Sequence, residues 1–305
     1  EAGSAEEALR LLEEREYDLI LLDLVMPGVT GYDLLLQLKD SPRWRRLPIL
    51  MISGDREIES AIRCIEVGAE DYLQKPFNRV LLKARISACI DKKLLTDEME
   101  AQNERYKSLL TRILPEAVVK RLDSGEQQIA DRFESTSILF SDLVGFTKLS
   151  ARLSPAVLIK TLDKVFSAFD AIAEEYGIEK IKTIGDAYMA AAGLPIARED
   201  HADALLKMGL AMIKKLAEIK GQLGLPLEMR IGIHSGPVAA GIIGEKRFLY
   251  DVWGDTVNIA SRLEANGQPG HVHFSEETKS ALTESGYQLI PTGGVHLKGK
   301  GFVES

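Results

Sequence analysis

Several residue types are scarce in this chain. It contains two cysteines, two tryptophans and five histidines among 305 residues. Cys64 and Cys89 fall in helix-like patterns without metal-binding spacing, so we interpret both as reduced thiols in a protein core. No run of about 18 apolar residues is present, and the sequence therefore predicts no membrane-spanning helix.

The chain also lacks an excess of positive charge. Lys and Arg number 38 against 46 Asp and Glu, which gives a formal net charge of −8. This balance argues against a general nucleic-acid binder, although it leaves room for a small basic pocket. The first residues are acidic and contain no apolar segment of the kind that a signal peptide needs, so we expect a cytoplasmic protein.

Helix-like and strand-like patterns alternate over residues 1–90. It predicts a parallel sheet covered by helices, with Asp23, Ser53 and Lys75 at the strand ends, where open α/β sheets place their sites. The expected strands cover residues 17–22, 48–53 and 69–74, and the expected helices cover 4–16, 32–39, 57–68 and 79 onward.

This first region resembles the receiver domain of two-component response regulators, which has a flavodoxin-like fold. The resemblance implies phosphorylation of Asp23, a switch hydroxyl on Ser53, a phosphate-contacting Lys75 and a sensor histidine kinase as partner. The family begins with a strand and a helix that carry an acidic pair for Mg²⁺, whereas this sequence begins at the second helix. Either that segment is missing or the domain is incomplete. We favour a missing segment, because a sheet without its central strand would expose apolar neighbours.

Residues 91–132 are expected to form a helical linker. Its stripe residues are spaced 4, 3, 4, 3 and 4, as in a parallel dimeric coiled coil. The alternative is one amphipathic helix packed on its own domain. Pro115 interrupts the pattern and can open a second short helix. The stripe consists of Leu95, Met99, Gln102, Tyr106, Leu109 and Ile113.

Residues 133–305 show a mixed α and β pattern with three distinctive segments. In the first, an apolar run ends on Asp142 and a turn with Gly145 follows; in the second, apolar residues flank Asp186. The third, residues 250–262, has the pattern of a strand end, a turn and a helix with polar side chains. Together they resemble the ferredoxin-like catalytic domain of class III nucleotide cyclases, which convert ATP or GTP into a cyclic 3′,5′-monophosphate and pyrophosphate.

This region is expected to contain several strands and two long helices. Strands are predicted over residues 135–141, 178–183, 187–192, 227–234, 247–252, 271–274 and 288–297. Long helices are predicted over 154–176 and 199–223. The glycine-dense segment 236–244 is interpreted as a hairpin that packs on a partner subunit.

Asp142 and Asp186 each border a buried strand pattern, and antiparallel pairing would bring them together. Two metal ions bridged by two carboxylates can activate an attacking oxygen and stabilise a leaving one. We expect two Mg²⁺ or Mn²⁺ ions per site, with the carbonyl of Leu143 as a further ligand by resemblance. Phe146 and Thr147 open a helix whose free N–H groups suit the β- and γ-phosphates.

A lysine and an aspartate can read adenine. By resemblance Lys182 donates to ring N1 and Asp251 accepts from the 6-amino group. Guanine presents the opposite pattern, and guanylate cyclases tend to carry Glu and Cys at these positions, so the sequence favours ATP. The resemblance also implies that Asn258 orients the ribose, and that Arg262, one helical turn away, stabilises charge on the α-phosphate.

Arg230 and Lys298 match phosphate-contacting positions of the family, and His234 is interpreted as a structural strand residue. The two halves of the site occur once each in the chain, so the resemblance implies a C₂ homodimer with two shared sites. One chain would supply the metal ligands, and its partner would supply Lys182, Asp251, Asn258 and Arg262.

The sequence thus predicts an ATP-cyclising homodimer that a receiver domain regulates through a coiled coil. A guanylate cyclase is one alternative. A catalytically silent module that senses nucleotide is another, but the complete set of site residues argues against it. A diguanylate cyclase would need a Gly-Gly-acidic-acidic-Phe turn, which the sequence lacks.

Overall fold

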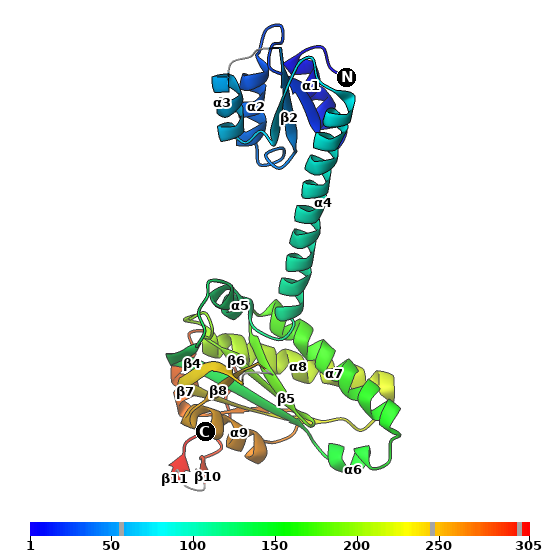
Figure 1. Ribbon diagram of the computed structural model, residues 1–305. Coiled ribbons are helices and arrows are strands. Elements are labelled where there is room, and N and C mark those ends of the chain that lie inside the picture. Colours follow the sequence, from blue (N-terminus) through cyan, green and yellow to red (C-terminus); the bar gives the residue numbers. More distant parts are fainter. Residues whose placement is uncertain (55–57, 245–247, 298–300) are drawn as a thin grey trace. The chain divides into compact units, whose positions relative to one another are not determined.

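The computed structural model describes residues 1–54, 58–244, 248–297 and 301–305 (Figure 1). The contacts within the chain divide it into two units, Glu1–Ser108 and Leu109–Ser305. Among the residues so described, no helix combines the length and the apolar composition needed to cross a membrane. Cys64 and Cys89 are both free and buried, and burial raises the pKa of both thiols.

The first unit has a three-stranded parallel sheet in the order β1–β2–β3, as the alternating pattern predicts. Every residue of the central strand β2 is buried, which is typical of a parallel strand covered on both faces. Thr30 and Asp33 form a capping box at the start of α2. The elements are α1 (Ala5–Glu14), β1 (Ile20–Asp23), α2 (Gly31–Asp40), β2 (Ile49–Ser53), α3 (Ile58–Val67), β3 (Asp71–Gln74) and α4 (Arg79–Leu110).

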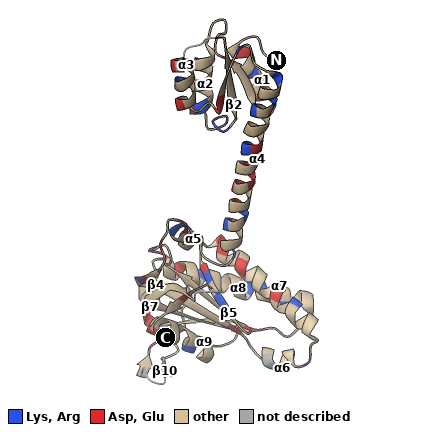
Figure 2. Ribbon diagram, in the orientation of Figure 1, with Lys and Arg blue, Asp and Glu red and all other residues tan. Residues whose placement is uncertain are grey.

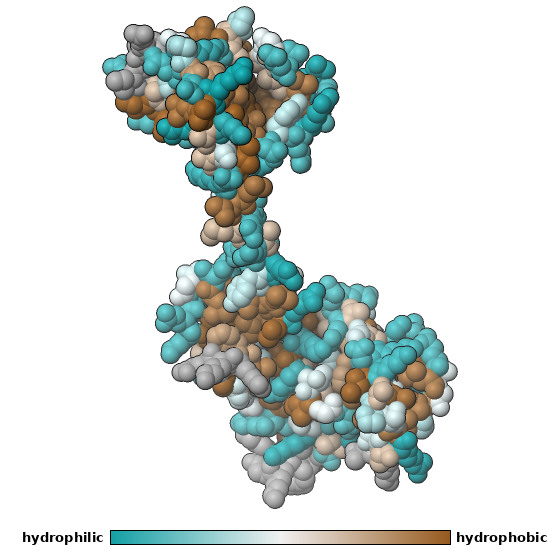
Figure 3. Space-filling model, turned by 45° about the vertical axis from the view of Figure 1, so that its right-hand side comes forward, coloured by the Kyte–Doolittle hydropathy of each residue, from teal (hydrophilic) through white to brown (hydrophobic). Residues whose placement is uncertain are grey.

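Helix α4 is continuous over 32 residues. Acidic and basic residues both lie along it (Figure 2), and apolar side chains are exposed on it (Figure 3). The four apolar members of the predicted stripe within the helix are between 52% and 71% exposed in the single chain. The helix ends at Leu110, so the stripe is shorter than predicted and Ile113 lies beyond it. A proline disfavours helical geometry in the residue before it, and Pro115 follows closely.

The second unit is built on a six-stranded sheet with the path β5–β6–β4–β7–β8 and with β9 paired to β7. Helices α7 and α8 pack on one face (Figure 1), where they share a core with Leu139 and Leu143 of β4. The alternate residues Ile138 and Phe140 belong to a second core with α5 and α9, because successive side chains of a strand point to opposite faces.

The helices and strands of this second unit lie between Glu116 and Val303. In chain order they are α5 (Glu116–Asp123), β4 (Ala130–Leu143), α6 (Phe146–Ser150), α7 (Pro155–Glu175), β5 (Glu179–Ile184), β6 (Ala187–Ala192), α8 (His201–Leu223), β7 (Met229–Ile243), β8 (Leu249–Trp253), α9 (Asp255–Asn266), β9 (Val272–Phe274), α10 (Glu276–Ala281), β10 (Val295–Leu297) and β11 (Gly301–Val303).

Two expectations for this unit need correction. Residues 236–244 do not form a hairpin by themselves: β7 continues to Ile243 and forms the hairpin with β8. Burial alternates at Val238 and Ala240, which is a strand pattern that the glycines obscure. The strand expected over 288–297 is present only as β10, because Gly293 and Gly294 both have positive φ angles that interrupt extended backbone.

Candidate active site

The carboxylates of Asp142 and Asp186 lie at neighbouring strand ends. Strands β4 and β6 are antiparallel, and Asp142 pairs with Ala187, the residue after Asp186. Burial raises the pKa of Asp186, and the negative charge of Asp142 raises it further. A divalent cation would relieve this repulsion, and carboxylate oxygens are ligands that Mg²⁺ prefers. The two side chains therefore fit a Mg²⁺ or Mn²⁺ site.

The residues that follow Asp142 can contribute mainly through their backbone. Leu143 ends β4 with its side chain buried, so its carbonyl is the group that could bind a cation. The Phe146 side chain belongs to the hydrophobic core, which leaves its N–H for a phosphate. The side chain of Thr147 and all of Lys298 lie outside the described residues.

The guanidinium of Arg230 is held beside the two aspartates. Residues Asp142 and Arg230 are direct neighbours across β4 and β7. Arg230 Nη2 donates to Asp142 Oδ2 over 3.1 Å, and Nη1 donates to the Ala265 carbonyl over 3.0 Å. Arg230 Nε also lies 3.2 Å from Glu264 Oε1. The sequence predicted a phosphate-contacting role for Arg230 but not this set of neighbours.

Sequence reasoning missed Glu264. Its side chain is 11% exposed. Burial raises its pKa to about 7; the positive charge of Arg230 opposes this rise, and the negative charges of Asp142 and Asp186 add to it. The sequence did contain a signal for the burial of Glu264. The buried residues of α9 are Thr256, Ala260, Leu263 and Glu264. Their spacing is that of one helix face, and a glutamate on an apolar face is unusual.

Helix α9 reaches this position because it packs very closely on β7. A Cβ atom added to Gly232 would lie 2.1 Å from Glu264 N and 2.4 Å from the Ala260 carbonyl oxygen. These separations are far below van der Waals contact, so any residue larger than glycine would push the helix away from the sheet. The close approach places Glu264 over the start of β7.

Lys182 and Asp251 form an ion pair within one chain. Lys182 Nζ donates to Asp251 Oδ2, and Asp251 Oδ1 accepts from the N–H of Val252 over 2.8 Å. The Lys182 side chain is 30% exposed and the Asp251 side chain is 9% exposed. A cationic donor and an anionic acceptor therefore stand side by side at a partly open position.

Asn258 and Arg262 both lie on α9, one helical turn apart. The Asn258 side chain is exposed, and that of Arg262 is partly exposed. His234 is buried in β7, and its Nδ1 lies 2.6 Å from Ser275 Oγ. Burial lowers the pKa of His234. This environment is that of a structural residue, as the sequence indicates.

The first unit gathers its three predicted residues at one edge of its sheet. Lys75 Nζ donates to Asp23 Oδ2. The N–H of Lys75 donates to the carbonyl of Ser53 over 2.7 Å, and the Lys75–Pro76 peptide bond is cis. Asp23 ends β1 and Ser53 ends β2, so the carboxyl ends of parallel strands bring these groups together.

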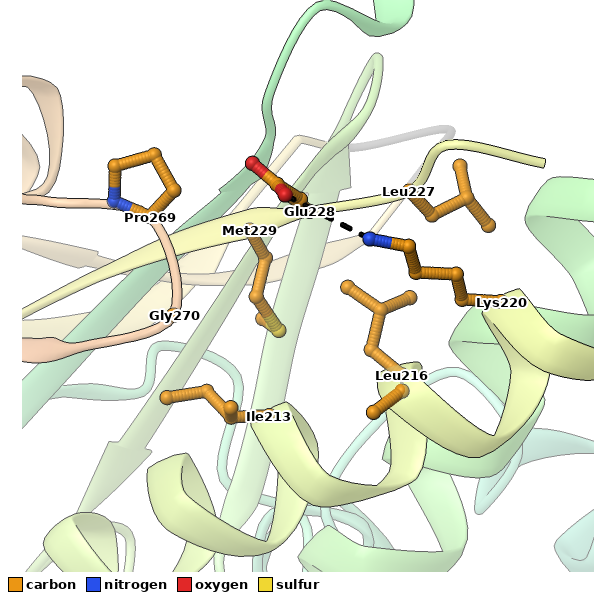
Figure 4. Close-up of a pocket in the computed structure, with 9 residues that line it drawn as sticks. Ile213, Leu216, Lys220, Leu227, Glu228, Met229, Pro269 and Gly270 are labelled. Atoms are coloured by element: carbon orange, nitrogen blue, oxygen red, sulfur yellow. Dashed lines mark ion pairs between the residues drawn. The ribbon is translucent and has the colours of Figure 1, made fainter.

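A pocket of about 180 Å³ lies elsewhere in the second unit, between α8 and the start of β7 (Figure 4). Its lining is mostly apolar, and Lys220 reaches across it toward Glu228, 3.6 Å away. Met229, which lines the pocket, directly precedes Arg230 in β7. None of the predicted site residues lines it, so we do not assign it to the catalytic site.

Comparison with known proteins identifies both units. Residues 129–305 match the family model of the adenylate and guanylate cyclase catalytic domain. The chain belongs to the adenylate and guanylate cyclase family. Residues 1–87 match the response regulator receiver domain, so this cyclase carries a receiver domain before its catalytic domain.

Relatives of this cyclase include enzymes named for either purine. The adenylate cyclase of Mycobacterium tuberculosis (strain ATCC 25618 / H37Rv) is 40% identical over 68% of this chain and 47% of that protein. The guanylate cyclase soluble subunit beta-2 of Rattus norvegicus is 36% identical over 72% of this chain and 33% of that protein. The chain therefore spans about half or less of the length of these relatives.

A solved structure with the same fold is the catalytic core of a rhodopsin-guanylyl cyclase with converted specificity, in complex with ATPαS. It is 38% identical with a TM-score of 0.55, and the match covers 57% of this chain and 95% of that chain. Family membership thus establishes a nucleotide cyclase domain, and the choice between the two purines needs a separate argument.

Proposed function

We propose that this chain is an adenylate cyclase, which converts ATP into 3′,5′-cyclic AMP and pyrophosphate. The observation that carries the proposal is the ion pair between Lys182 and Asp251. Adenine offers an acceptor at N1 beside a donor at its 6-amino group, so a lysine donor next to an aspartate acceptor matches it. Guanine offers a donor at N1 and an acceptor at O6, which would face like groups on the protein.

The proposed chemistry is attack of the 3′-hydroxyl oxygen on the α-phosphorus. That bond forms, the bond to the bridging oxygen of pyrophosphate breaks, and the hydroxyl proton leaves to solvent. Asp142 and Asp186 would hold Mg²⁺ or Mn²⁺, two ions per site, and such ions would make the hydroxyl more acidic and neutralise phosphate charge. Arg230 contacts the β- and γ-phosphates, and Lys298 is proposed to assist it.

The helix α9 supplies the remaining groups. Asn258 orients the ribose, and the exposure of its side chain leaves it accessible. Arg262 stabilises the charge that develops on the α-phosphate, for which a planar and permanently charged guanidinium is well suited. Phosphoryl transfer depends mostly on such positioning and charge stabilisation, so no separate protein base is required.

We further propose that two copies of the chain share their sites. Asp142, Asp186 and Arg230 would act with Lys182, Asp251, Asn258 and Arg262 of the other copy. Each of these groups occurs once per chain, which suits a C₂ dimer with two equivalent sites. The exposed apolar stripe on α4 supports the dimer, since a coiled coil would cover it.

Regulation is proposed to begin at Asp23. A sensor histidine kinase partner would phosphorylate it, and Lys75, which already contacts Asp23, would pair with the phosphoryl group. The continuous helix α4 begins at Arg79, shortly after Lys75, and supports transmission toward the catalytic domain. Residence in the cytoplasm stays a prediction of the sequence.

Identification of the product tests the enzymatic proposal. The purified protein is incubated with ATP or GTP and with Mg²⁺ or Mn²⁺, and the products are identified by mass spectrometry. We expect cyclic AMP and pyrophosphate from ATP. Cyclic GMP alone would favour a guanylate cyclase, and no cyclic product from a demonstrated dimer would favour a silent nucleotide sensor.

A further inference from the structure

The contacts of Arg230 raise a question about Glu264. A guanidinium beside Asp142 neutralises a carboxylate that is also suited to a cation. If Asp142 holds a cation, Arg230 retains two neighbours, the Ala265 carbonyl at 3.0 Å and Glu264 at 3.2 Å. Of these two, Glu264 alone is a side chain that can carry charge. Its carboxylate is therefore the group that can keep the arginine in place while Asp142 is engaged elsewhere.

The contact between Arg230 and Glu264 does not have the geometry of a hydrogen bond. Arg230 Nε and Glu264 Oε1 are both buried and lack a hydrogen-bond partner among the residues that the structure describes. Their 3.2 Å separation is short enough for strong attraction, and a small rotation of the guanidinium would align them. Leaving a buried donor and acceptor unpaired costs free energy. A shift of the arginine that forms the hydrogen bond between them would therefore be favourable.

A purely structural explanation accounts poorly for a glutamate here. Burying a carboxylate is costly, and replacing a buried ion pair by well-packed apolar residues is often neutral or stabilising. The fold nevertheless brings this carboxylate against Arg230 through the close packing of α9 on Gly232. The arrangement favours a role in directing the arginine.

We propose that Glu264 is a positioning residue that holds Arg230 for contact with the triphosphate of the nucleotide. This inference rests on the proposed function of Arg230 as a phosphate ligand. Glu264 does not touch the substrate itself. It fixes the guanidinium from the side of Nε, and the Nη2 edge that now contacts Asp142 becomes available to a phosphate oxygen.

Inorganic tripolyphosphate with Mg²⁺ is the probe, because it contains no purine. Its binding to the purified protein is measured by titration calorimetry for wild type, Glu264→Gln and Glu264→Ala. Glu264→Gln keeps the side-chain volume, so it removes the charge without leaving a cavity. We expect binding to weaken by about tenfold in Glu264→Ala and by less in Glu264→Gln, since an amide oxygen still accepts from Nε.

A double-mutant cycle with Arg230 distinguishes positioning from general damage. In an Arg230→Ala background, Glu264→Ala should cause no further loss of tripolyphosphate binding, because the side chain that it positions is gone. The matched control is Asp203→Asn. Asp203 is a buried carboxylate that accepts from Thr283 and Glu284, so its loss should lower the melting temperature and leave binding unchanged.

Steady-state kinetics with the nucleotide substrate provide a second test of the role of Glu264. Arg230, held by Glu264, should contact the triphosphate equally in the ground state and in the transition state. Loss of Glu264 should therefore raise KM by about tenfold and change kcat little. Unchanged binding in both Glu264 variants, or an equal loss with and without Arg230, would overturn the inference. Failure to form cyclic AMP would instead count against the adenylate assignment, because the tripolyphosphate result does not depend on the base.

Discussion

Lys182 and Asp251 are in direct contact although their strands stand at opposite ends of the sheet path. They are 69 positions apart in the sequence, and β5 and β8 touch because the sheet curls. The two proposed purine-reading groups are thus assembled by one chain before any nucleotide binds. Within this ion pair each side chain compensates the charge of the other, so adenine binding would exchange an ion pair for two hydrogen bonds.

The purine preference should be reversible at this pair. We expect Lys182→Glu combined with Asp251→Cys to shift the ratio of kcat/KM toward GTP by at least about tenfold, since a hydrogen-bonding site strongly rejects a mismatched partner. Lys182→Glu alone places two carboxylates together and should impair both substrates. An unchanged ATP preference in the double variant, with folding intact, would discredit the assignment of these two residues.

A mixing experiment addresses the sharing of sites between chains. Asp142→Ala removes a proposed metal ligand. Asn258→Ala removes a side chain that is proposed to complete the site of the other chain. Each variant alone should lose nearly all activity. Mixed dimers should regain one working site, to be detected by cyclic nucleotide formation. If demonstrated heterodimers stay inactive, each chain must hold a complete site of its own.

Gly232 should tolerate no side chain. We expect Gly232→Ala to lower the free energy of unfolding by about 1–3 kcal/mol and to reduce activity, because the new methyl displaces α9, which carries the proposed catalytic residues Asn258 and Arg262. Gly221→Ala is the matched control. Gly221 is an exposed glycine of α8 with nothing within 4 Å of an added Cβ, and its replacement should stabilise the helix by up to about 1 kcal/mol. Equal effects of the two changes on urea unfolding would contradict this account.

Glu179 predicts a specific dependence of stability on pH. Burial raises the pKa of its carboxyl from 4.5 to about 7 in the folded chain. Because the folded pKa is the higher one, this group contributes stability below pH 4.5, and that stability is lost as the pH rises through about 7.

The variant Glu179→Gln cannot deprotonate, so it should gain stability relative to wild type between pH 5 and pH 8. We expect a gain on the order of 1–3 kcal/mol, measured by urea unfolding at both values. Glu174→Gln, which removes an exposed carboxyl on the adjacent helix α7, is the control. Parallel pH profiles for wild type and Glu179→Gln would rule out the assignment.

Asp23 should be required for any response to phosphorylation. A phosphodonor should change cyclase activity, and Asp23→Ala should abolish that change while leaving a basal rate. The physical reason is that the doubly charged phosphoryl group would pair with Lys75. Identical activity of wild type and variant, with and without the phosphodonor, would refute the regulatory proposal.

Much of the fold could be predicted because the signals are local. The apolar runs that end at Asp23 and Ser53 fix strands of the first unit, and the strand over Ala187–Ala192 matches its predicted bounds. The pairing of Asp142 beside Asp186 followed from antiparallel strands and needed no knowledge of packing.

The remaining features depend on contacts between distant segments. Glu264 meets Arg230 because α9 rests on Gly232, and no pattern within either segment specifies that distance. The extension of β7 beyond residue 236 depends on pairing with β4 and β8, which outweighs the breaking tendency of its glycines. Tertiary packing, rather than local preference, decided these cases.

The unbroken course of α4 has a consequence for protein engineering. An α-helix turns by about 100° and advances about 1.5 Å for each residue. One residue inserted into Arg79–Leu110 would therefore change the angular phase of everything that follows. Seven inserted residues complete nearly two turns and restore that phase. The length of this helix thus sets the rotational phase of the residues that follow it. Variants whose helix lengths differ by seven residues should therefore have equivalent activity.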